Sequence, residues 1–270
     1  MSPTHAADIT GVLAAMGSRL DARPFVILLD VDGTLAPIAP RPEAAMVPDD
    51  TRAAVRRLTR AAGVHVALVS GRGALDAARL VGVEGVWALG NHGMELLAPD
   101  GSLEPDPAVL PFEPDVAEAA RALAALAANT PGALLENKRW TLSLHYRLVD
   151  ETLVPELRRS AGEVARAGSL RVTEGKKVIE VRPRVAIDKG TASVALATRL
   201  GAFAPGGAAL FAGDDRTDED AIRALRAHST AAITIRVGTD GGDTDAEFRV
   251  SSPETFRELL AGIAARRRDP

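Results

Sequence analysis

Residues 25–34 read FVILLDVDGT and give the clearest indication of the fold. The first five residues of this stretch are apolar, as is typical of a buried central strand. Asp30 and Asp32 then point to the same side of a strand end, where unpaired charge is costly and a divalent metal ion would be favourable. Gly33 and Thr34 turn the chain and could present N–H groups to an anion. Taken alone, the stretch also fits a strand followed by an ordinary Asp-Gly turn.

Strands and helices alternate on both sides of this stretch. The strands are expected at residues 26–30, 64–70, 86–89, 208–212 and 233–237, and the helices at 6–20, 49–62, 74–81, 189–200, 217–226 and 253–266. A small hairpin is expected from residue 94 to residue 103. This rhythm predicts an α/β fold with a doubly wound, Rossmann-like parallel sheet.

The composition changes at residues 104–114, where four prolines suggest a linker. A second pattern follows, with helices expected at residues 115–129 and 151–167 and strands at 133–137, 141–147, 170–173 and 178–181. The order αββαββ suits an antiparallel sheet backed by helices. We therefore expect a core of residues 1–109 and 184–270, interrupted by an inserted α+β module at 110–183.

Bulk properties exclude several classes of protein. The net charge of −4 argues against general nucleic-acid binding, which needs a basic face. The chain has no cysteine, which excludes disulfides, thiolate catalysis and zinc–thiolate sites and is compatible with a cytoplasmic location. No apolar run approaches the roughly 20 residues of a membrane helix, and the first ten residues lack a secretory signal pattern. We expect a cytoplasmic protein that binds no membrane, and a monomer is favoured.

A phosphate-binding turn is indicated after the second core strand. Strand ends in parallel sheets gather on one edge, where ligands of such folds bind. The hydroxyl of Ser70 and the N–H groups of Gly71 and Arg72 could hold a phosphate oxygen there. A strand-to-helix turn capped by serine is the alternative.

Lys189 opens a predicted helix, which places its charge against the helix dipole. A bound phosphate would explain that placement, and a solvated surface lysine is the alternative.

The segment GDDRTDED at residues 213–220 packs five acids into eight residues after an apolar strand. Capping of the following helix explains part of it. Asp214 lies on the same expected sheet edge as Asp30, and carboxylates that meet from distant strands indicate Mg²⁺. Asp218 is expected to lie behind the metal ligands, where it orients waters or Lys189.

In this order and context, the motifs resemble those of the haloacid dehalogenase superfamily of phosphotransferases. The resemblance implies that Asp30 attacks phosphorus and forms an aspartyl-phosphate, and that Asp32 is the general acid and then the base. It implies a magnesium ion held by the Asp30 side chain, the Asp32 carbonyl and Asp214. Ser70 and Lys189 would stabilise the phosphoryl oxygens.

A narrower resemblance, to the trehalose-6-phosphate phosphatase family, runs from about residue 25 to residue 257. It rests on Gly90-Asn91-His92-Gly93, Glu136-Asn137-Lys138, His145-Tyr146-Arg147, Glu180-Val181-Arg182-Pro183 and the acidic segment. The insert lies where the superfamily places a type-two cap, and its glutamates would accept hydrogen bonds from sugar hydroxyls. The substrate-binding residues so implied are Thr34, Gly71, Arg72, Asn91, His92, Glu136, Lys138, Arg147, Glu180 and Asp215.

The resemblance implies magnesium-dependent hydrolysis of trehalose 6-phosphate, the last step of trehalose biosynthesis. A capped phosphatase for another sugar phosphate, such as sucrose phosphate or glucosylglycerol phosphate, would share every core motif. A phosphoacceptor signalling domain or a sugar-phosphate sensor without turnover is the alternative from another class. Asp32 and the large insert argue against the signalling domain, because an aspartyl-phosphate message should avoid rapid hydrolysis.

Overall fold

The computed structural model describes residues 4–5, 9–39, 41–175, 177–239 and 242–267. The chain forms two compact units. The first joins Met1–Glu104 with Ile187–Pro270, and the second is the continuous segment Pro105–Ala186.

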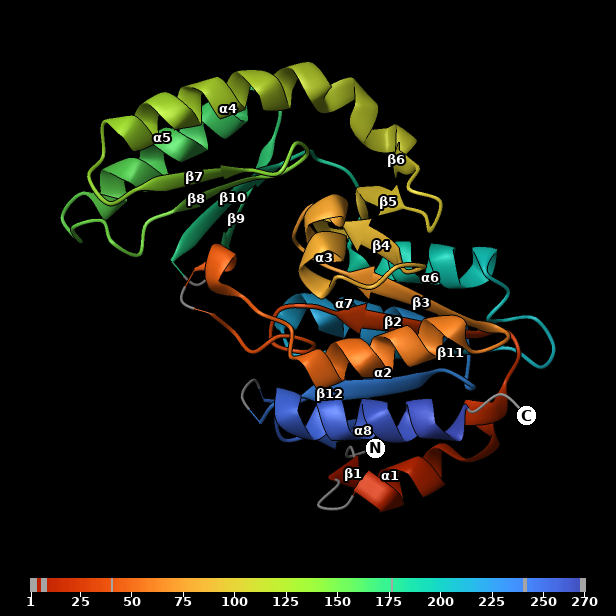
Figure 1. Cartoon of the computed structure of the whole chain (residues 1–270). Helices are drawn as coiled ribbons and strands as arrows, with labels where there is room; N and C mark the ends of the chain where they lie inside the picture. Colours follow the sequence, from red (N-terminus) through yellow and green to blue (C-terminus); the bar gives the residue numbers. More distant parts are fainter. Residues whose placement is uncertain (1–3, 6–8, 40, 176, 240–241, 268–270) are drawn as a thin grey trace. The chain divides into compact units, whose positions relative to one another are not determined.

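The first unit contains a nine-stranded sheet within the described residues (Figure 1). Its spatial order is β1 (Thr4–His5), β13 (Phe248–Val250), β12 (Ile233–Val237), β11 (Ala208–Gly213), β2 (Phe25–Asp30), β3 (Val64–Val69), β4 (Trp87–Gly90), β5 (Glu95–Leu97) and β6 (Leu103–Pro105). The strands from β1 to β4 in this order pair in parallel, and β5 runs antiparallel to β4. The predicted parallel α/β core is thus confirmed.

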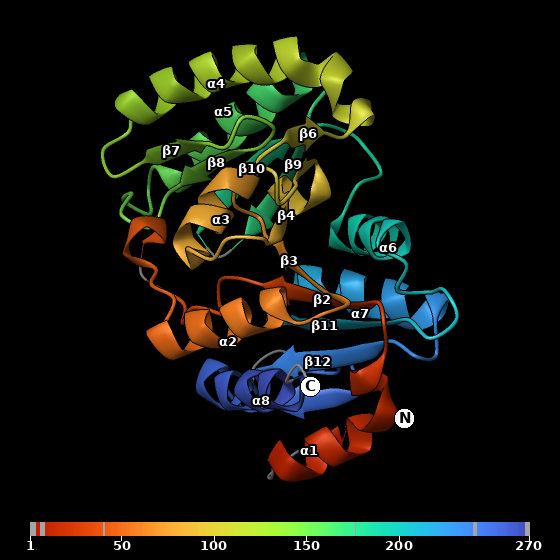
Figure 2. The same cartoon turned by 45° about the vertical axis from the view of Figure 1, so that its right-hand side comes forward.

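Helices pack on both faces of this sheet (Figure 2). One face carries α1 (Ile9–Met16), α2 (Asp49–Arg60), α3 (Ala74–Val81) and α8 (Pro253–Arg266), and the other carries α6 (Lys189–Arg199) and α7 (Arg216–His228). Both faces of β2 are therefore covered, and all six of its residues are buried. This explains why β2 reads as a continuous apolar run rather than an alternating one.

The second unit is an antiparallel sheet with helices on one face. Along the chain its elements are α4 (Glu113–Ala128), β7 (Leu134–Asn137), β8 (Leu142–His145), α5 (Val154–Ala167), β9 (Arg171–Gly175) and β10 (Val178–Arg182). The strands lie in the order β7-β8-β10-β9, and all three pairings are antiparallel. Leu142, Leu144, Ile179 and Val181 pack with the helices in one apolar core. The αββαββ order matches the sequence prediction.

The prediction was wrong where elements are short. The proposed linker at residues 104–114 holds the end of β6 and a 3₁₀ helix, η4 (Pro107–Phe112). Asp106 caps η4 by accepting from the N–H of Ala108, and prolines are tolerated there because few N–H groups need internal partners. Strands β1 and β13 were not predicted, since two or three residues carry no readable period.

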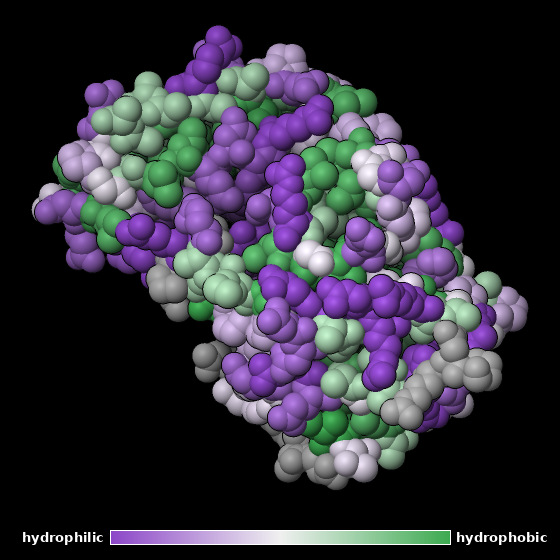
Figure 3. Space-filling model, in the orientation of Figure 1, coloured by the Kyte–Doolittle hydropathy of each residue, from purple (hydrophilic) through white to green (hydrophobic). Residues whose placement is uncertain are grey.

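The first predicted helix is also shorter than expected. The structure has α1 from Ile9 to Met16, followed by the 3₁₀ helix η1 (Gly17–Asp21), and residues 6–8 lie outside the described residues. Across the described ranges, no helix combines the length and apolarity needed to cross a bilayer. Hydrophilic residues cover much of the face shown in Figure 3, with apolar areas between them.

Candidate active site

The carboxyl ends of neighbouring parallel strands bring the predicted core residues to one edge of the sheet. Asp30 ends β2 and pairs in register with Val69 of β3, so Ser70 follows directly beside it. Strand β11 lies on the other side of β2, and Asp214 follows its last residue. Segments almost 200 residues apart in sequence thus supply one cluster of side chains. We therefore treat this edge as the candidate active site.

Lys189 is buried in this cluster, with only 3% of its surface exposed, so the surface-lysine alternative is wrong. Its ammonium donates to Asp30 Oδ1 at 2.7 Å and to Asp218 Oδ1 at 2.8 Å. Helix α6 can bring it there because Gly190 has no side chain: a Cβ would lie 2.5 Å from the carbonyl oxygen of Asp220 in α7. Burial lowers the pKa of Lys189, but Asp218 and Asp30 more than offset this and hold it well above its usual value.

The acidic residues fit a divalent cation. Carboxylate oxygens of Asp30, Asp214 and Asp218 lie within 4.8 Å of one another. Asp30 Oδ2 and Asp214 Oδ1 are buried and have no hydrogen-bond partner among the described residues, which is costly unless a ligand binds them. Both oxygens of Asp218 already accept hydrogen bonds, from Lys189 and from the N–H groups of Asp214 and Asp215. This geometry suits Asp30 and Asp214 as ligands and Asp218 as their support.

Gly33 makes room for this cluster. Its φ of +95° lies in the region that favours glycine, and a Cβ would lie 2.2 Å from Asp214 Oδ2. The glycine of the Asp-x-Asp-Gly-Thr motif is therefore required both by the turn and by the carboxylate opposite it. The hydroxyl of Thr34 is buried in the same turn and finds no acceptor within the described part of the chain.

Burial and crowding change the acidity of the cluster. Burial and the charges of Asp214 and Asp215 raise the pKa of Asp30 to about 7, although Lys189 opposes this rise. Burial and the charges of Asp218 and Asp215 raise the pKa of Asp214 to about 7. Burial would also raise the pKa of Asp215, but Lys189 and hydrogen bonds from Thr217 and Asp218 bring it down to about 2. Near neutral pH, a cation must therefore compete with protons for Asp30 and Asp214.

This competition predicts that magnesium stabilises the protein more at alkaline pH. In the folded protein, Asp30 and Asp214 have a pKa of about 7, which is higher than in the unfolded chain. Without metal, the protein therefore becomes less stable as pH rises from about 4 to about 7, because the unfolded chain ionises in this range while the folded protein keeps its protons. A cation that binds the two ionised carboxylates restores the lost stability. We expect Mg²⁺ to raise the unfolding temperature clearly at about pH 8 and little at about pH 5.5. An equal rise at both pH values, or a similar rise in the Asp214→Asn variant, would contradict this assignment.

Asp32 is held by Arg72. The guanidinium donates to both carboxylate oxygens of Asp32 at 2.7 Å and also to Asp76 at 3.2 Å. The hydrogen bond to Asp32 raises the pKa of Arg72, which stays charged. The sequence placed Arg72 among the substrate-binding residues, and the structure adds these hydrogen bonds to the candidate general acid Asp32.

Asn91 and His92 occupy a strained turn after β4. Both have positive φ, 51° and 59°, and their N–H groups donate to the carbonyls of Arg72 and Ser70. Glu95, which was not predicted as a site residue, accepts hydrogen bonds from the Asn91 amide and from the N–H of Ala74. The lack of a side chain at Gly71 is needed here, because a Cβ would lie 2.9 Å from the His92 ring. The turn is therefore built to present these residues beside Ser70.

In the second unit, the predicted sugar-binding residues share the sheet face opposite the helices. The strand register aligns Glu136, Ser143, Glu180 and Thr173 in one row across all four strands. Lys138 Nζ and Ser143 Oγ each lie 3.4 Å from Glu180 Oε1, and His145 Nε2 lies 3.1 Å from Glu136 Oε2. We call Glu136, Lys138, Ser143, His145, Thr173 and Glu180 the polar row.

Three members of the polar row, Ser143, His145 and Thr173, were not predicted as site residues. Alternation along the strands could have found them, because they share the face of Glu136 and Glu180. Arg147 lies in the exposed turn after β8 and is not part of the row.

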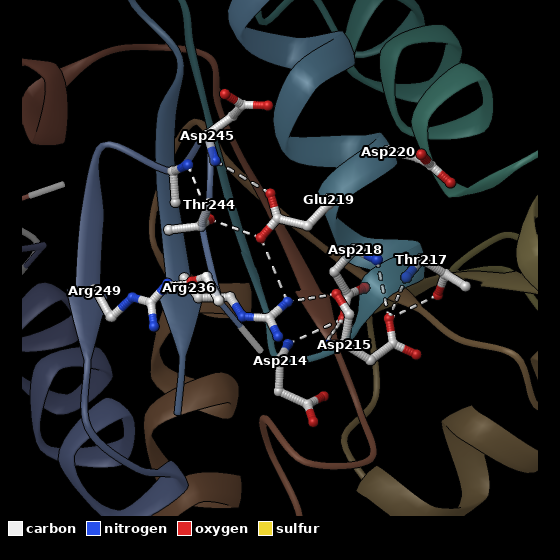
Figure 4. Close-up of polar contacts among 12 residues, drawn as sticks. Asp214, Asp215, Thr217, Asp218, Glu219, Asp220, Arg236, Thr244, Asp245 and Arg249 are labelled. Atoms are coloured by element: carbon white, nitrogen blue, oxygen red, sulfur yellow. Dashed lines mark hydrogen bonds and ion pairs between the residues drawn. The ribbon is translucent and has the colours of Figure 1, made fainter. Parts of the chain in front are cut away.

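Asp215 is the N-cap residue of α7 (Figure 4). Its carboxylate accepts hydrogen bonds from the N–H groups of Thr217 and Asp218, and the Asp218 carboxylate accepts from the N–H of Asp215 in return. This capping box satisfies N–H groups that a helix start leaves free. The sequence placed Asp215 with the substrate, and in the structure its carboxylate accepts hydrogen bonds from the start of this helix.

Comparisons with known proteins place this chain in one family. A family model described as trehalose-phosphatase matches residues 28–254. The chain is 38% identical over 261 residues to an uncharacterized glycosyl hydrolase of Mycobacterium tuberculosis, covering 95% of this chain and 19% of that protein. It is 36% identical over 265 residues to a trehalose-phosphate phosphatase of Mycobacterium avium, covering 95% of this chain and 66% of that protein.

A solved structure of similar fold is titled as a trehalose-6-phosphate phosphatase related protein. It has a TM-score of 0.78 and 26% sequence identity, and the match covers 89% of this chain and 97% of that one. The chain thus spans under two thirds of the length of the two curated relatives and nearly all of the solved structure.

Proposed function

This chain belongs to the trehalose-phosphatase family, and from this membership we propose that it hydrolyses trehalose 6-phosphate to trehalose and phosphate with the help of Mg²⁺. One observation carries the proposal. A buried lysine is paired with Asp30 beside Asp214, and each of these carboxylates keeps an oxygen free of partners among the described residues. This is the charge arrangement needed to bind a phosphate and a cation together.

Asp30 is the proposed nucleophile. One of its carboxylate oxygens forms a bond to phosphorus, and the sugar oxygen leaves with the electrons of the broken P–O bond. Lys189 balances the negative charge of the transferred group, and the Ser70 hydroxyl and nearby N–H groups bind its oxygens. A water molecule then attacks phosphorus, releases phosphate and regenerates the Asp30 carboxylate.

Asp32 is the proposed general acid and base. It gives a proton to the leaving sugar oxygen and later takes one from the attacking water. Arg72 fixes the orientation of its carboxylate through two hydrogen bonds of 2.7 Å. A fixed orientation favours proton transfer at one position, because less rotational freedom is lost on reaching the transition state.

Magnesium would be held by the side chains of Asp30 and Asp214 and by the Asp32 carbonyl. Bound there, it would supply positive charge between the phosphate and the carboxylates, which otherwise repel each other. Asp218 keeps the Asp214–Asp215 turn in place through its two hydrogen bonds to backbone N–H groups.

The polar row of the second unit is proposed to recognise the sugar. Its carboxylates each offer several acceptor positions, which suit the neighbouring hydroxyl groups of a sugar. Lys138 holds Glu180 in the row, at an Nζ–Oε1 distance of 3.4 Å. The unit would therefore set the specificity, while the first unit supplies the chemistry.

A panel of phosphate esters tests the proposed function. The protein is incubated with Mg²⁺ and trehalose 6-phosphate, sucrose 6-phosphate, glucosylglycerol phosphate or an aryl phosphate, and released phosphate is measured. We expect the highest kcat/KM for trehalose 6-phosphate and no release in excess chelator. Faster release from another sugar phosphate would overturn the substrate, and no release from any ester would overturn the activity.

The substitution Glu180→Ala should separate sugar recognition from chemistry. It removes a half-buried acceptor in the polar row, so we expect kcat/KM for trehalose 6-phosphate to fall by about ten- to a hundredfold. The value for a small aryl phosphate should change by less than about threefold, because that ester makes no sugar contacts. Equal losses on both esters would show that Glu180 supports the fold or the core site instead.

Glu174→Ala is the matched control for this test. Glu174 lies on β9 in the same sheet but pairs in register with Ile179, on the opposite face from Glu180. Its carboxylate contacts Arg158 at 3.0 Å, and about half of its side chain is exposed. We expect this variant to hydrolyse both esters at the rates of the unmodified protein.

A further inference from the structure

A buried arginine outside the predicted site contacts the turn that carries Asp214. Arg236 lies on β12, next to β11 in the sheet, and its side chain is only 6% exposed. Its Nη1 donates a short hydrogen bond to the carbonyl oxygen of Asp215 and lies 3.4 Å from Glu219 Oε1 (Figure 4). The charged guanidinium of Arg236 thus binds the backbone between Asp214, the candidate metal ligand, and helix α7.

Glu219 extends this contact to a second loop. It lies in the first turn of α7 and accepts hydrogen bonds from the Thr244 hydroxyl at 2.6 Å and from the N–H of Asp245 at 3.2 Å. Three segments therefore meet at one buried ion pair: strand β12, the start of α7 and the loop before β13 (Figure 4). Most surface ion pairs contribute little, but this one is largely removed from water, with side-chain exposures of 6% and 15%.

The Asp214–Asp215 turn is therefore held from two sides. Asp218 binds its N–H groups at 2.9 and 3.0 Å, and Arg236 binds the carbonyl oxygen of Asp215. The Asp214 carboxylate itself has one oxygen without a partner in the described ranges, so its position depends on this backbone. A small rotation of the peptide would move the carboxylate away from Asp30.

We propose that Arg236 and Glu219 are positioning residues that set the affinity of the Asp30–Asp214 site for Mg²⁺. Neither touches the reacting atoms: Arg236 acts through the Asp215 carbonyl, and Glu219 acts by orienting Arg236. Residues that hold metal ligands in place typically change metal affinity by about ten- to a hundredfold when they are substituted. The inference rests on the proposed function only in taking Asp30 and Asp214 as the ligands of the cation.

Direct titration with Mg²⁺ tests this role without relying on turnover. Binding is measured by calorimetry on the unmodified protein, Arg236→Met, Arg236→Lys and Glu219→Gln, each first shown to be folded by circular dichroism. We expect Arg236→Met to weaken Mg²⁺ binding at least about tenfold. Arg236→Lys should recover part of the loss, because it keeps the charge, and Glu219→Gln should have an intermediate effect.

Arg249→Met is the matched control. Arg249 lies on β13 in register with Arg236, is 8% exposed, and donates to the carbonyl oxygen of Gly242 rather than to the metal-binding turn. We expect this variant to lower the unfolding temperature without changing the affinity for Mg²⁺.

The outcomes separate the inference from the proposed function. If the unmodified protein binds Mg²⁺ and releases phosphate but Arg236→Met binds Mg²⁺ with unchanged affinity, the positioning role is overturned and the function stands. Equal weakening in Arg236→Met and Arg249→Met would assign both arginines to general stability and would also overturn it. If the unmodified protein binds no Mg²⁺, the assignment of Asp30 and Asp214 as a metal site is overturned, and the positioning role falls with it. Should Arg236→Met not fold, the affinities of Arg236→Lys and Glu219→Gln for Mg²⁺ decide instead: unchanged affinity in both would overturn the positioning role.

Discussion

Replacing Asp30 with asparagine is expected to lower the rate of phosphate release by at least about 10⁴-fold, since nucleophile substitutions remove the covalent route. An amide oxygen is a poor nucleophile, and the uncharged side chain is also a weaker ligand for a cation. The fold should survive, because asparagine has nearly the same shape and Lys189 remains paired with Asp218 at 2.8 Å. The measurement is single-turnover phosphate release, with circular dichroism as the test of folding.

Two further variants make this test specific. Asp30→Ala should be equally inactive, which excludes slow conversion of asparagine back to aspartate as a source of activity. Asp49→Asn carries the same change on α2, where the side chain is 98% exposed, and should leave turnover unchanged. Normal activity in Asp30→Asn would overturn the assignment of the nucleophile.

The second large effect is expected for Lys189→Met, on both activity and stability. The variant loses the charge that binds the transferred group, so turnover should fall by about 10²- to 10³-fold. It also leaves the buried carboxylates of Asp30 and Asp218 without their shared cation, which at about pH 8 should cost about 3–5 kcal/mol of unfolding free energy.

The stability loss should depend on pH. Burial already raises the pKa of Asp30 to about 7 and that of Asp218 well above its usual value, and removal of Lys189 raises both further. Protonation then neutralises the stranded carboxylates, so the deficit should shrink as pH falls from about 8 to about 5. Denaturant unfolding at several pH values measures this. A deficit that is constant with pH would contradict the role of Lys189 as their counter-charge.

Lys177→Met is the control for this comparison. Lys177 is half exposed and lies 3.6 Å from Glu151 on the surface of the second unit. We expect little change in either turnover or stability, because exposed ion pairs contribute at most about 1 kcal/mol.

Much of the core could be predicted because its chemistry is local in sequence. The apolar run of β2 and the acids at its end follow each other directly, and the same holds for β11 and Asp214. Parallel strand order then places these ends on one edge, which explains why residues almost 200 positions apart meet as expected. The helix–strand rhythm likewise predicts the αββαββ insert.

The residues that escaped prediction owe their importance to partners far away in sequence. Arg236 and Glu95 read as ordinary charged residues on or near strands, and only the folded chain shows that they are buried against a turn of the site. Arg72 could be placed at the site, but not its two hydrogen bonds to Asp32, which lies 40 residues earlier. Short elements such as β13 and η4 were missed because periodicity needs more residues than they contain.

The most direct test is to trap the covalent intermediate. The protein is mixed with Mg²⁺ and trehalose 6-phosphate, quenched in acid within one turnover, digested, and analysed by mass spectrometry. The peptide that contains Asp30 should carry the added mass of a phosphoryl group, and Asp30→Asn should abolish this product. Continued turnover with no phosphorylated peptide, or with the phosphoryl group on another residue, would contradict the account.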